Sequence, residues 1–347
     1  MTAHGPAHGP AHGPAHGPVH GLVLGKFLPP HRGHVHLCEV AARMCDELTI
    51  VVASLPREPI DGALRVAWMR ELFPRAAVVH HTAELPQEPA EHPDFWPLWR
   101  ASLRACAGRP VHRLFTSDRY GLRLAAELSA TWIPVDPDRA VFPVSGTAIR
   151  RAPMRHFGAL PRCVRPHFVR RVSVFGPEST GKSTLAAELA RACGTVWVPE
   201  FARAYLESRG GVLARPDIDV IGQGQIALED ALARDAARVL VCDTDPLLTV
   251  VWSEYMFGEA PAWLVAAARA RRYDLTLLCD VDLPWIDDLV RYLPEDRADF
   301  AARCECALRD AGRPYERVRG SGAARGEAAL AAVRALAAFE DEEEEAR

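Results

Sequence analysis

Short apolar runs alternate with amphipathic stretches through the first half of the chain. The apolar runs predict strands at residues 19–26, 48–54, 76–81 and 111–117, and the amphipathic stretches predict helices at 34–45, 64–72, 96–106 and 120–128. This order is typical of a doubly wound parallel sheet, an α/β fold in which ligands collect at the carboxyl ends of the strands. His31 and Ser117 both fall at such ends.

A second, independent series of the same kind begins at Arg171. Its apolar runs predict strands at 172–175, 195–199, 239–242 and 276–279, with a helix at 184–193 after the first of them. Several of these strands end beside acidic residues. We therefore predict two doubly wound parallel-sheet domains, residues 19–165 and 166–338, joined within the Pro- and Arg-rich stretch 161–170.

The two ends of the chain lack this alternation. Residues 3–18 are four copies of Ala-His-Gly-Pro, so we expect residues 1–18 to be disordered, and we expect the acidic residues 339–347 to be a frayed helix end or a solvated tail. Because only the repeat stands before Val19, we expect no DNA-binding domain and no nucleic-acid partner.

Composition narrows the class of protein. A length of 347 residues suits two domains, and 49% hydrophobic with 25% charged residues is ordinary for a globular protein. A net charge of -4 argues against a protein that coats nucleic acid, and no apolar run is long enough for membrane insertion. The nine cysteines include no C-x-x-C pair, which favours free thiols in a cytoplasmic protein. The sequence does not determine whether the protein forms a homo-oligomer.

The basic residues are unusual, because 41 are Lys or Arg and only two of these are lysine, Lys26 and Lys182. An ammonium enters a tight cluster of oxyanions as a point charge, which a forked guanidinium cannot do. Each lysine lies in a phosphate-binding signature. We therefore predict two nucleotide sites in one polypeptide.

The signature around Lys26 reads G-K-F-x-P-x-H-x-G-H, from Gly25 through Phe27, His31 and Gly33 to His34. It follows a predicted strand and opens a helix, whose N-terminus favours negative charge. Gly33 allows a phosphate to approach the backbone, and two imidazoles can donate to one phosphate chain; the alternative is that one histidine merely caps the helix. A second element supplies two hydroxyls and an arginine suited to a triphosphate: Ser145, Thr147 and Arg150.

This pairing resembles the nucleotidylyltransferase superfamily and, within it, nicotinamide mononucleotide (NMN) adenylyltransferases. The resemblance implies attack of a substrate phosphate on the α-phosphorus of ATP, with phosphate contacts from Lys26, His31, His34, Ser145, Thr147 and Arg150. Arg57 is a further candidate at a strand end. Trp96 and Trp99 are candidates to stack on a nicotinamide ring, and ordinary helix core is an equal alternative for each.

The signature around Lys182 is a P-loop, G-x-x-x-x-G-K-S, between a predicted strand and a helix. Backbone amides would cradle the phosphates of ATP, Lys182 would reach the β and γ oxygens, and Ser183 would hold Mg²⁺. The predicted ATP-binding residues are Gly176, Pro177, Glu178, Ser179, Thr180, Gly181, Ser183 and Thr184. The short domain suits a small-metabolite kinase.

Charged residues at the ends of later strands complete this second site. Glu200 is the candidate base for a substrate hydroxyl, with Arg203 near the transferred phosphate, although Asp243 or Asp245 could also be the base. Asp243 could hold Mg²⁺, and the candidates for substrate contact are Asp243, Asp245, Asp282 and Trp285. The alternative for each carboxylate is a helix cap or a surface turn. Arg291 falls in a Pro-broken segment that we predict to be a lid over ATP.

An NMN adenylyltransferase pattern followed by a G-P-E-S-x-G-K-S P-loop resembles the bifunctional NadR-type family. The resemblance implies a nucleotidylyltransferase Rossmann-like domain followed by a P-loop ribosylnicotinamide kinase domain. It also implies ATP-dependent conversion of nicotinamide riboside to NMN and then to NAD. Two other functions stay open: a regulatory NAD sensor with a working kinase and weak adenylyl transfer, and an adenylyltransferase for another phosphate ester, such as phosphopantetheine, fused to a small-metabolite kinase.

Overall fold

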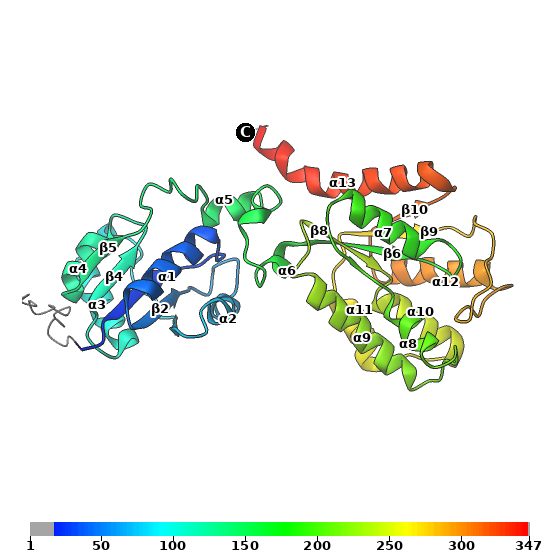
Figure 1. Cartoon of the computed structure of the whole chain (residues 1–347), viewed down its shortest axis with the longest axis horizontal. Helices are drawn as coiled ribbons and strands as arrows, with labels where there is room; N and C mark the ends of the chain where they lie inside the picture. The colour runs from blue at the N-terminus through cyan, green and yellow to red at the C-terminus, as the bar shows by residue number, and fades with distance from the viewer. Residues whose placement is uncertain (1–16, 346–347) are drawn as a thin grey trace, which may run out of the picture. The chain divides into compact units, whose positions relative to one another are not determined.

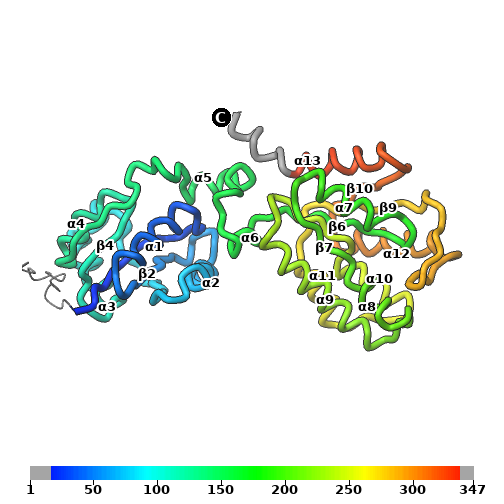
Figure 2. Tube along the Cα trace, in the orientation of Figure 1, coloured from blue at the N-terminus to red at the C-terminus, as the bar shows by residue number. Residues whose placement is uncertain are grey.

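The computed structural model describes residues 17–345, with side chains as far as residue 336. Most of the Ala-His-Gly-Pro repeat and the last two residues of the acidic tail lie outside the described residues. The chain forms two compact units, one ending at Thr147 and the other beginning at Ala148. Figures 1 and 2 show the elements of each unit, and each unit is described below by itself.

The first unit is built on a parallel sheet of five strands in the order β3-β2-β1-β4-β5. The strands are β1 (His20–Gly25), β2 (Glu47–Ala53), β3 (Ala77–His81), β4 (Arg113–Thr116) and β5 (Thr131–Pro134). The chain moves outward from β1 to β3 and then crosses to β4 on the other side of β1. This reversal places a ligand crevice beside the carboxyl end of β1, where Lys26 follows.

Helices cover both faces of this sheet. They are α1 (Arg32–Met44), α2 (Gly62–Leu72), α3 (Phe95–Ala107) and α4 (Gly121–Leu128), with a short 3-10 turn, η1 (Pro89–Glu91), before α3. Because side chains alternate along a strand, Val23 of β1 packs with α1 and α2 while its neighbour Leu22 packs with α3 and α4. This burial on both faces explains why the strands read as continuous apolar runs.

The second unit repeats the plan with the strand order β10-β9-β6-β8-β7, again entirely parallel. The strands are β6 (Arg170–Phe175), β7 (Trp197–Val198), β8 (Val239–Asp243), β9 (Leu275–Cys279) and β10 (Tyr315–Val318). Central β6 lies between β8 and β9, so the residues that follow these three strands meet at one edge. The P-loop follows β6, and Asp243 is the last residue of β8.

Two groups of helices cover this second sheet (Figure 1). One face packs against α7 (Lys182–Ala192) and α13 (Gly322–Glu345). The other packs against α10 (Pro246–Phe257), α11 (Ala262–Ala270) and α12 (Arg297–Asp310), with α8 (Phe201–Glu207) and α9 (Asp217–Leu232) beside them. Between β5 and β6 the chain forms α5 (Gly146–Arg151), η2 (Phe157–Ala159) and α6 (Arg165–Phe168).

The predicted α/β class with two doubly wound parallel sheets is confirmed. The edge strands β5 and β10 were not predicted, because edge strands are half exposed and carry no continuous apolar run: β5 reads Thr-Trp-Ile-Pro and β10 reads Tyr-Glu-Arg-Val. Within residues 17–345, no helix is long and apolar enough to cross a membrane.

Two candidate nucleotide sites

The P-loop is a strained turn that only glycine can complete at its start. Gly176 has φ of 132°, and a Cβ there would lie 2.8 Å from the carbonyl oxygen of Cys279 on β9. Inside the turn, Lys182 Nζ and Thr180 Oγ1 both donate to the carbonyl of Pro177, at 2.8 Å each. Lys182 is only 9% exposed. The loop is therefore closed around one ammonium.

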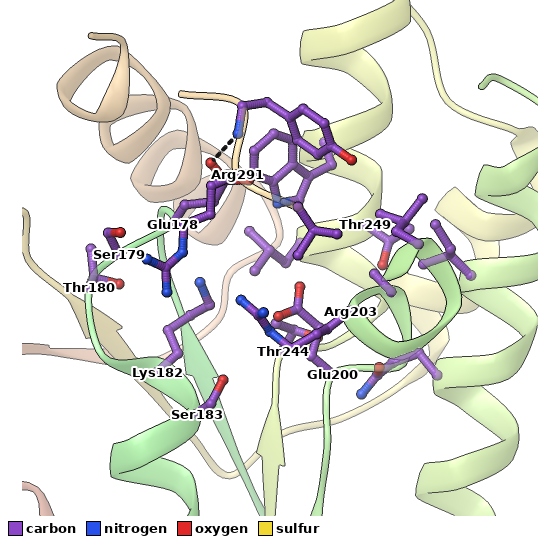
Figure 3. A pocket seen from close by; sticks show the side chains of 18 of the residues that line it. Glu178, Ser179, Thr180, Lys182, Ser183, Glu200, Arg203, Thr244, Thr249 and Arg291 are labelled. Carbon is purple, nitrogen blue, oxygen red and sulfur yellow. Dashed lines mark hydrogen bonds between the residues drawn. The ribbon is translucent and has the colours of Figure 1, made fainter. Parts of the chain in front are cut away.

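A pocket with an empty volume of about 1040 Å³ opens beside this loop. Figure 3 shows the side chain of Lys182 reaching into it from the P-loop and those of Glu200 and Arg203 from the beginning of α8. The predicted residues that line it are Glu178, Ser179, Thr180, Gly181, Lys182, Ser183, Thr184, Glu200, Arg203 and Arg291. The structure thus brings together the P-loop, the beginning of α8 and the predicted lid.

Asp243 ends β8 and immediately precedes Thr244, which lines the pocket; Asp243 is not itself among the described residues that line it. The positive charges around its carboxylate neutralise it poorly. Burial and the negative charge of Glu200 raise the pKa of Asp243 to about 6, against the opposing effects of Lys182 and of a hydrogen bond from Ser183. Its Oδ1 is buried and has no hydrogen-bond partner among the described residues. A hydroxyl and an unsatisfied carboxylate oxygen side by side are suitable ligands for Mg²⁺.

Two arginines of the pocket, Arg203 and Arg291, pair with Asp288, an acidic residue that we did not predict from the sequence. Arg203 pairs with Asp288 at 2.9 Å, and Arg291 lies 3.9 Å from the same carboxylate. The side-chain hydrogen bond from Arg203 lowers the pKa of Asp288. Asp288 therefore keeps two guanidinium groups, from α8 and from the lid, beside one another at the mouth of the pocket.

Three predicted substrate residues are engaged elsewhere. Asp245 is fully buried and accepts hydrogen bonds from Ser173 at 2.7 Å and Arg313 at 2.6 Å, as well as from the first turn of α10. Asp282 pairs with Arg325 at 3.0 Å, and Trp285 lies under the guanidinium of Arg297 at 5.6 Å. These three side chains are not among the described residues that line the pocket. Helix capping, the stated alternative, accounts for Asp245.

The pocket also contains polar and aromatic residues that the sequence reasoning missed. They are Gln225 on α9, Thr244 after β8, Thr249 and Trp252 on α10, and Tyr292 in the lid. Gln225 accepts a hydrogen bond from the backbone N–H of Phe201 at 2.9 Å, which anchors the beginning of α8 behind Glu200. Only Thr244 could have been found from the sequence, because it follows a predicted strand.

In the first unit, His31 and His34 form a stacked pair at the N-terminus of α1. Their ring centroids are 3.7 Å apart, and the edge of Phe27 meets His34. Burial, reinforced by the charge of Arg139, lowers the pKa of His31 to about 4, and burial beside His31 holds the pKa of His34 well below its usual range. Both rings are therefore neutral at pH 7.

One nitrogen of each imidazole is also unsatisfied, although His34 has a hydrogen bond with the backbone of Pro29. Within the described part of the chain, the buried Nδ1 atoms of His31 and His34 have no hydrogen-bond partner. A Cβ on Gly33 would lie 3.1 Å from the His31 ring, so the glycine leaves this helix mouth open. Unpaired imidazole nitrogens at a helix N-terminus suit the oxygens of a phosphate chain.

Lys26 is held in place by two residues that the sequence reasoning missed. Its ammonium pairs with Glu58 at 3.1 Å, and the other oxygen of Glu58 pairs with Arg65 at 2.7 Å. Arg65 is fully buried on α2 and also donates to the carbonyl of Lys26 at 2.7 Å. Arg65 thus positions both the backbone of Lys26 and the carboxylate that holds its side chain.

A pocket of about 820 Å³ lies beside Lys26, and Gly25, Trp96 and Trp99 line it. Trp99 is 9% exposed, stacks on His81 and donates from Nε1 to the carbonyl of Pro86 at 2.9 Å. Trp99 is therefore a packed core residue with one edge on the pocket. Trp96 is half-buried and is the freer of the two rings.

The remaining predicted phosphate contacts lie on loops and on α5. Arg57 is exposed after β2, in the loop that also carries Glu58. Ser145 stands immediately before α5, and Thr147 and Arg150 are one turn apart on that helix. All three residues make contacts within the protein.

This chain is similar in sequence to known proteins. A model of the AAA domain family matches residues 171–325. The "Trifunctional NAD biosynthesis/regulator protein NadR" of Salmonella typhimurium is 30% identical over 292 residues, covering 78% of this chain and 70% of the relative. The protein of the same name from Escherichia coli is 30% identical over 301 residues, covering 80% and 73%.

Two solved structures share the fold. A NadR protein in complex with NR superposes with a TM-score of 0.75 at 23% identity, covering 90% of this chain and 94% of that one. A NadR protein in complex with NAD and AMP-PNP gives a TM-score of 0.71 at 23% identity, covering 91% and 95%. The fold of this chain, with one α/β unit following another along the sequence, is therefore a known one.

Proposed function

The chain belongs to the NadR family, and from this we propose that it makes NAD by two ATP-dependent reactions in two separate sites. The second unit phosphorylates nicotinamide riboside to NMN. The first unit transfers an adenylyl group from ATP to NMN and releases pyrophosphate. The observation that carries the proposal is that each lysine signature follows the first strand of its own parallel sheet and lies beside its own pocket.

In the kinase, the substrate hydroxyl attacks the γ-phosphorus of ATP and ADP leaves. Glu200 takes the hydroxyl proton; the support for this role is that Glu200 lines the same pocket as the P-loop residues. Lys182, Arg203 and Arg291 neutralise the charge of the transferred phosphoryl group. Ser183 and Asp243 would hold Mg²⁺, which when bound neutralises the β and γ oxygens of ATP.

In the adenylyltransferase, a phosphate oxygen of NMN attacks the α-phosphorus of ATP without a covalent enzyme intermediate. The residues position and neutralise the reactants rather than move protons. His31 and His34 contact the phosphates with neutral rings, Lys26 supplies a charge held by Glu58, and Ser145, Thr147 and Arg57 complete the phosphate contacts. Trp96 faces the pocket that would take the nicotinamide ring. ATP consumption and free cysteines support a cytoplasmic setting.

A coupled assay tests the proposal. The protein is incubated with nicotinamide riboside, ATP and Mg²⁺, and NMN and NAD are quantified separately over time. We expect NMN to appear first and NAD to follow. Accumulation of NMN without NAD would favour a regulatory NAD sensor, and adenylyl transfer to phosphopantetheine instead of NMN would overturn the assignment of the first site.

A further inference from the structure

Two neighbouring residues of the P-loop bind the segment that covers the kinase pocket. We call residues 284–296, between β9 and α12, the lid segment. Ser179 Oγ contacts the backbone of Ile286 at 3.2 Å, and Glu178 Oε2 accepts hydrogen bonds from the N–H groups of Tyr292 at 2.7 Å and Leu293 at 3.1 Å. Figure 3 draws the bond from Glu178 to this segment.

Glu178 binds the lid segment directly beside residues that line the pocket. Arg291, the residue immediately before the two amides, lines the pocket together with Tyr292. The hydroxyl of Tyr292 in turn donates to the carbonyl of Gly211 at 2.8 Å, which ties the lid segment to the loop after α8. The position of Arg291 is therefore set by a short peptide anchored at Glu178 and at Gly211.

A carboxylate within a phosphate-binding loop needs an explanation, because its charge repels the phosphates that the loop binds. Burial raises the pKa of Glu178, and the two lid amides oppose that shift. Both amides donate to the same oxygen, Oε2. The side chain is thus engaged with the lid segment, so contact with the nucleotide does not account for it.

We propose that Glu178 is a positioning residue of the kinase, which anchors the lid segment so that Arg291 faces the phosphates of ATP. This inference rests on the proposed kinase function. Glu178 acts through Arg291 and need not touch the nucleotide. Because one oxygen accepts both bonds, an uncharged amide oxygen in the same place should serve nearly as well.

The test compares Glu178→Gln with Glu178→Ala in the full chain. We expect Glu178→Ala to raise the KM for ATP and to speed hydrogen exchange at the amides of Tyr292 and Leu293, each by roughly 10-fold or more, because both hydrogen bonds that hold these amides are lost. Glu178→Gln should stay within about 3-fold of wild type in both measurements. Equal damage from both substitutions, or unchanged exchange in Glu178→Ala, would overturn the proposal.

A double-variant cycle tests the route through Arg291. If Glu178 acts only by placing Arg291, then Glu178→Ala combined with Arg291→Ala should be no worse than Arg291→Ala alone. Additive losses would mean that Glu178 contributes independently, and the proposal would fall. Ser179→Ala is the matched control, since it removes the bond to Ile286 but should leave exchange at the two anchored amides unchanged.

Two readouts separate this inference from the proposed function. Hydrogen exchange in the central strands β6 and β8 of the same variants reports whether the second unit remains folded. If the wild-type chain phosphorylates no riboside, the kinase assignment fails, whereas hydrogen exchange measured with and without MgATP still decides whether Glu178 anchors the lid segment.

Discussion

The two lysines of this chain are held in opposite ways. Lys182 is 9% exposed, and its ammonium donates to a carbonyl of its own loop. The Lys26 side chain is 50% exposed, and its ammonium pairs with the carboxylate of Glu58. In the P-loop the backbone is folded around the charge, whereas in the first unit the charge is held at an open helix mouth by a neighbouring acid. The two sites should therefore respond differently to the same substitution.

The largest difference is expected at Lys182. Lys182→Ala should reduce riboside phosphorylation by on the order of 10²-fold or more, because the transition state loses a phosphate-clamping charge. Lys182→Arg should be almost as damaging, since a forked guanidinium does not fit a loop closed around one ammonium. Steady-state kinase assays on the purified variants measure both effects.

Adenylyl transfer by the Lys182 variants is the internal control, and it should be largely unchanged. Kinase activity of Lys182→Arg within a few-fold of wild type would show that the P-loop tolerates either cation. The retention of lysine in a chain rich in arginine would then be accidental.

The converse prediction concerns His34. His34→Ala should lower adenylyl transfer steeply, by roughly 10²-fold, because it removes a buried imidazole from the proposed phosphate site. The kinase should survive, since His34 belongs to the other sheet. Rates are compared at saturating NMN, and an unchanged adenylyl transfer rate would mean that His34 only packs beneath Phe27 and His31.

Lowering the pH should distinguish the two activities. Asp243 must be ionised to hold Mg²⁺, and its pKa is about 6, so kcat/KM of the kinase should fall about tenfold per pH unit below that value. His31 has a pKa of about 4 and stays neutral over the same range, so it contributes no comparable fall in adenylyl transfer.

Raising the Mg²⁺ concentration should move the kinase inflection to lower pH, because the metal and the proton compete for one carboxylate. The measurement is a set of pH profiles at several Mg²⁺ concentrations. If the inflection does not shift with Mg²⁺ concentration, a group other than Asp243 is responsible for it.

The smallest effect is expected for Lys26→Arg. The side chain ends in a half-exposed position, and a guanidinium can also pair with Glu58, so adenylyl transfer should fall only a few-fold. Lys26→Ala should fall by roughly 10-fold or more, because it removes the charge altogether. If Lys26→Arg instead matched the loss seen for Lys182→Arg, the contrast between an open and a closed lysine site would be untenable.

Most of the fold could be predicted because it depends on local patterns. Strands buried on both faces read as apolar runs, and phosphate signatures at their ends require a turn followed by a helix N-terminus. The edge strands β5 and β10 escaped prediction because their exposed faces tolerate polar residues. Asp245 illustrates the same limit in the site: its position after β8 suggested a ligand, but its contacts with Ser173 and Arg313 come from distant elements.

The sequence by itself determined the two-sheet plan, the two lysine signatures and the family, because each is written in residues close together along the chain. Only the tertiary structure decided that Glu58 and Arg65 hold Lys26, that Asp288 gathers Arg203 and Arg291, and that Glu178 faces the lid segment. Arg203 and Asp288 are 85 residues apart, and Glu178 and Tyr292 are 114 apart. Contacts across such separations depend on how strands and loops pack, and the spacing of residues along the sequence does not predict them.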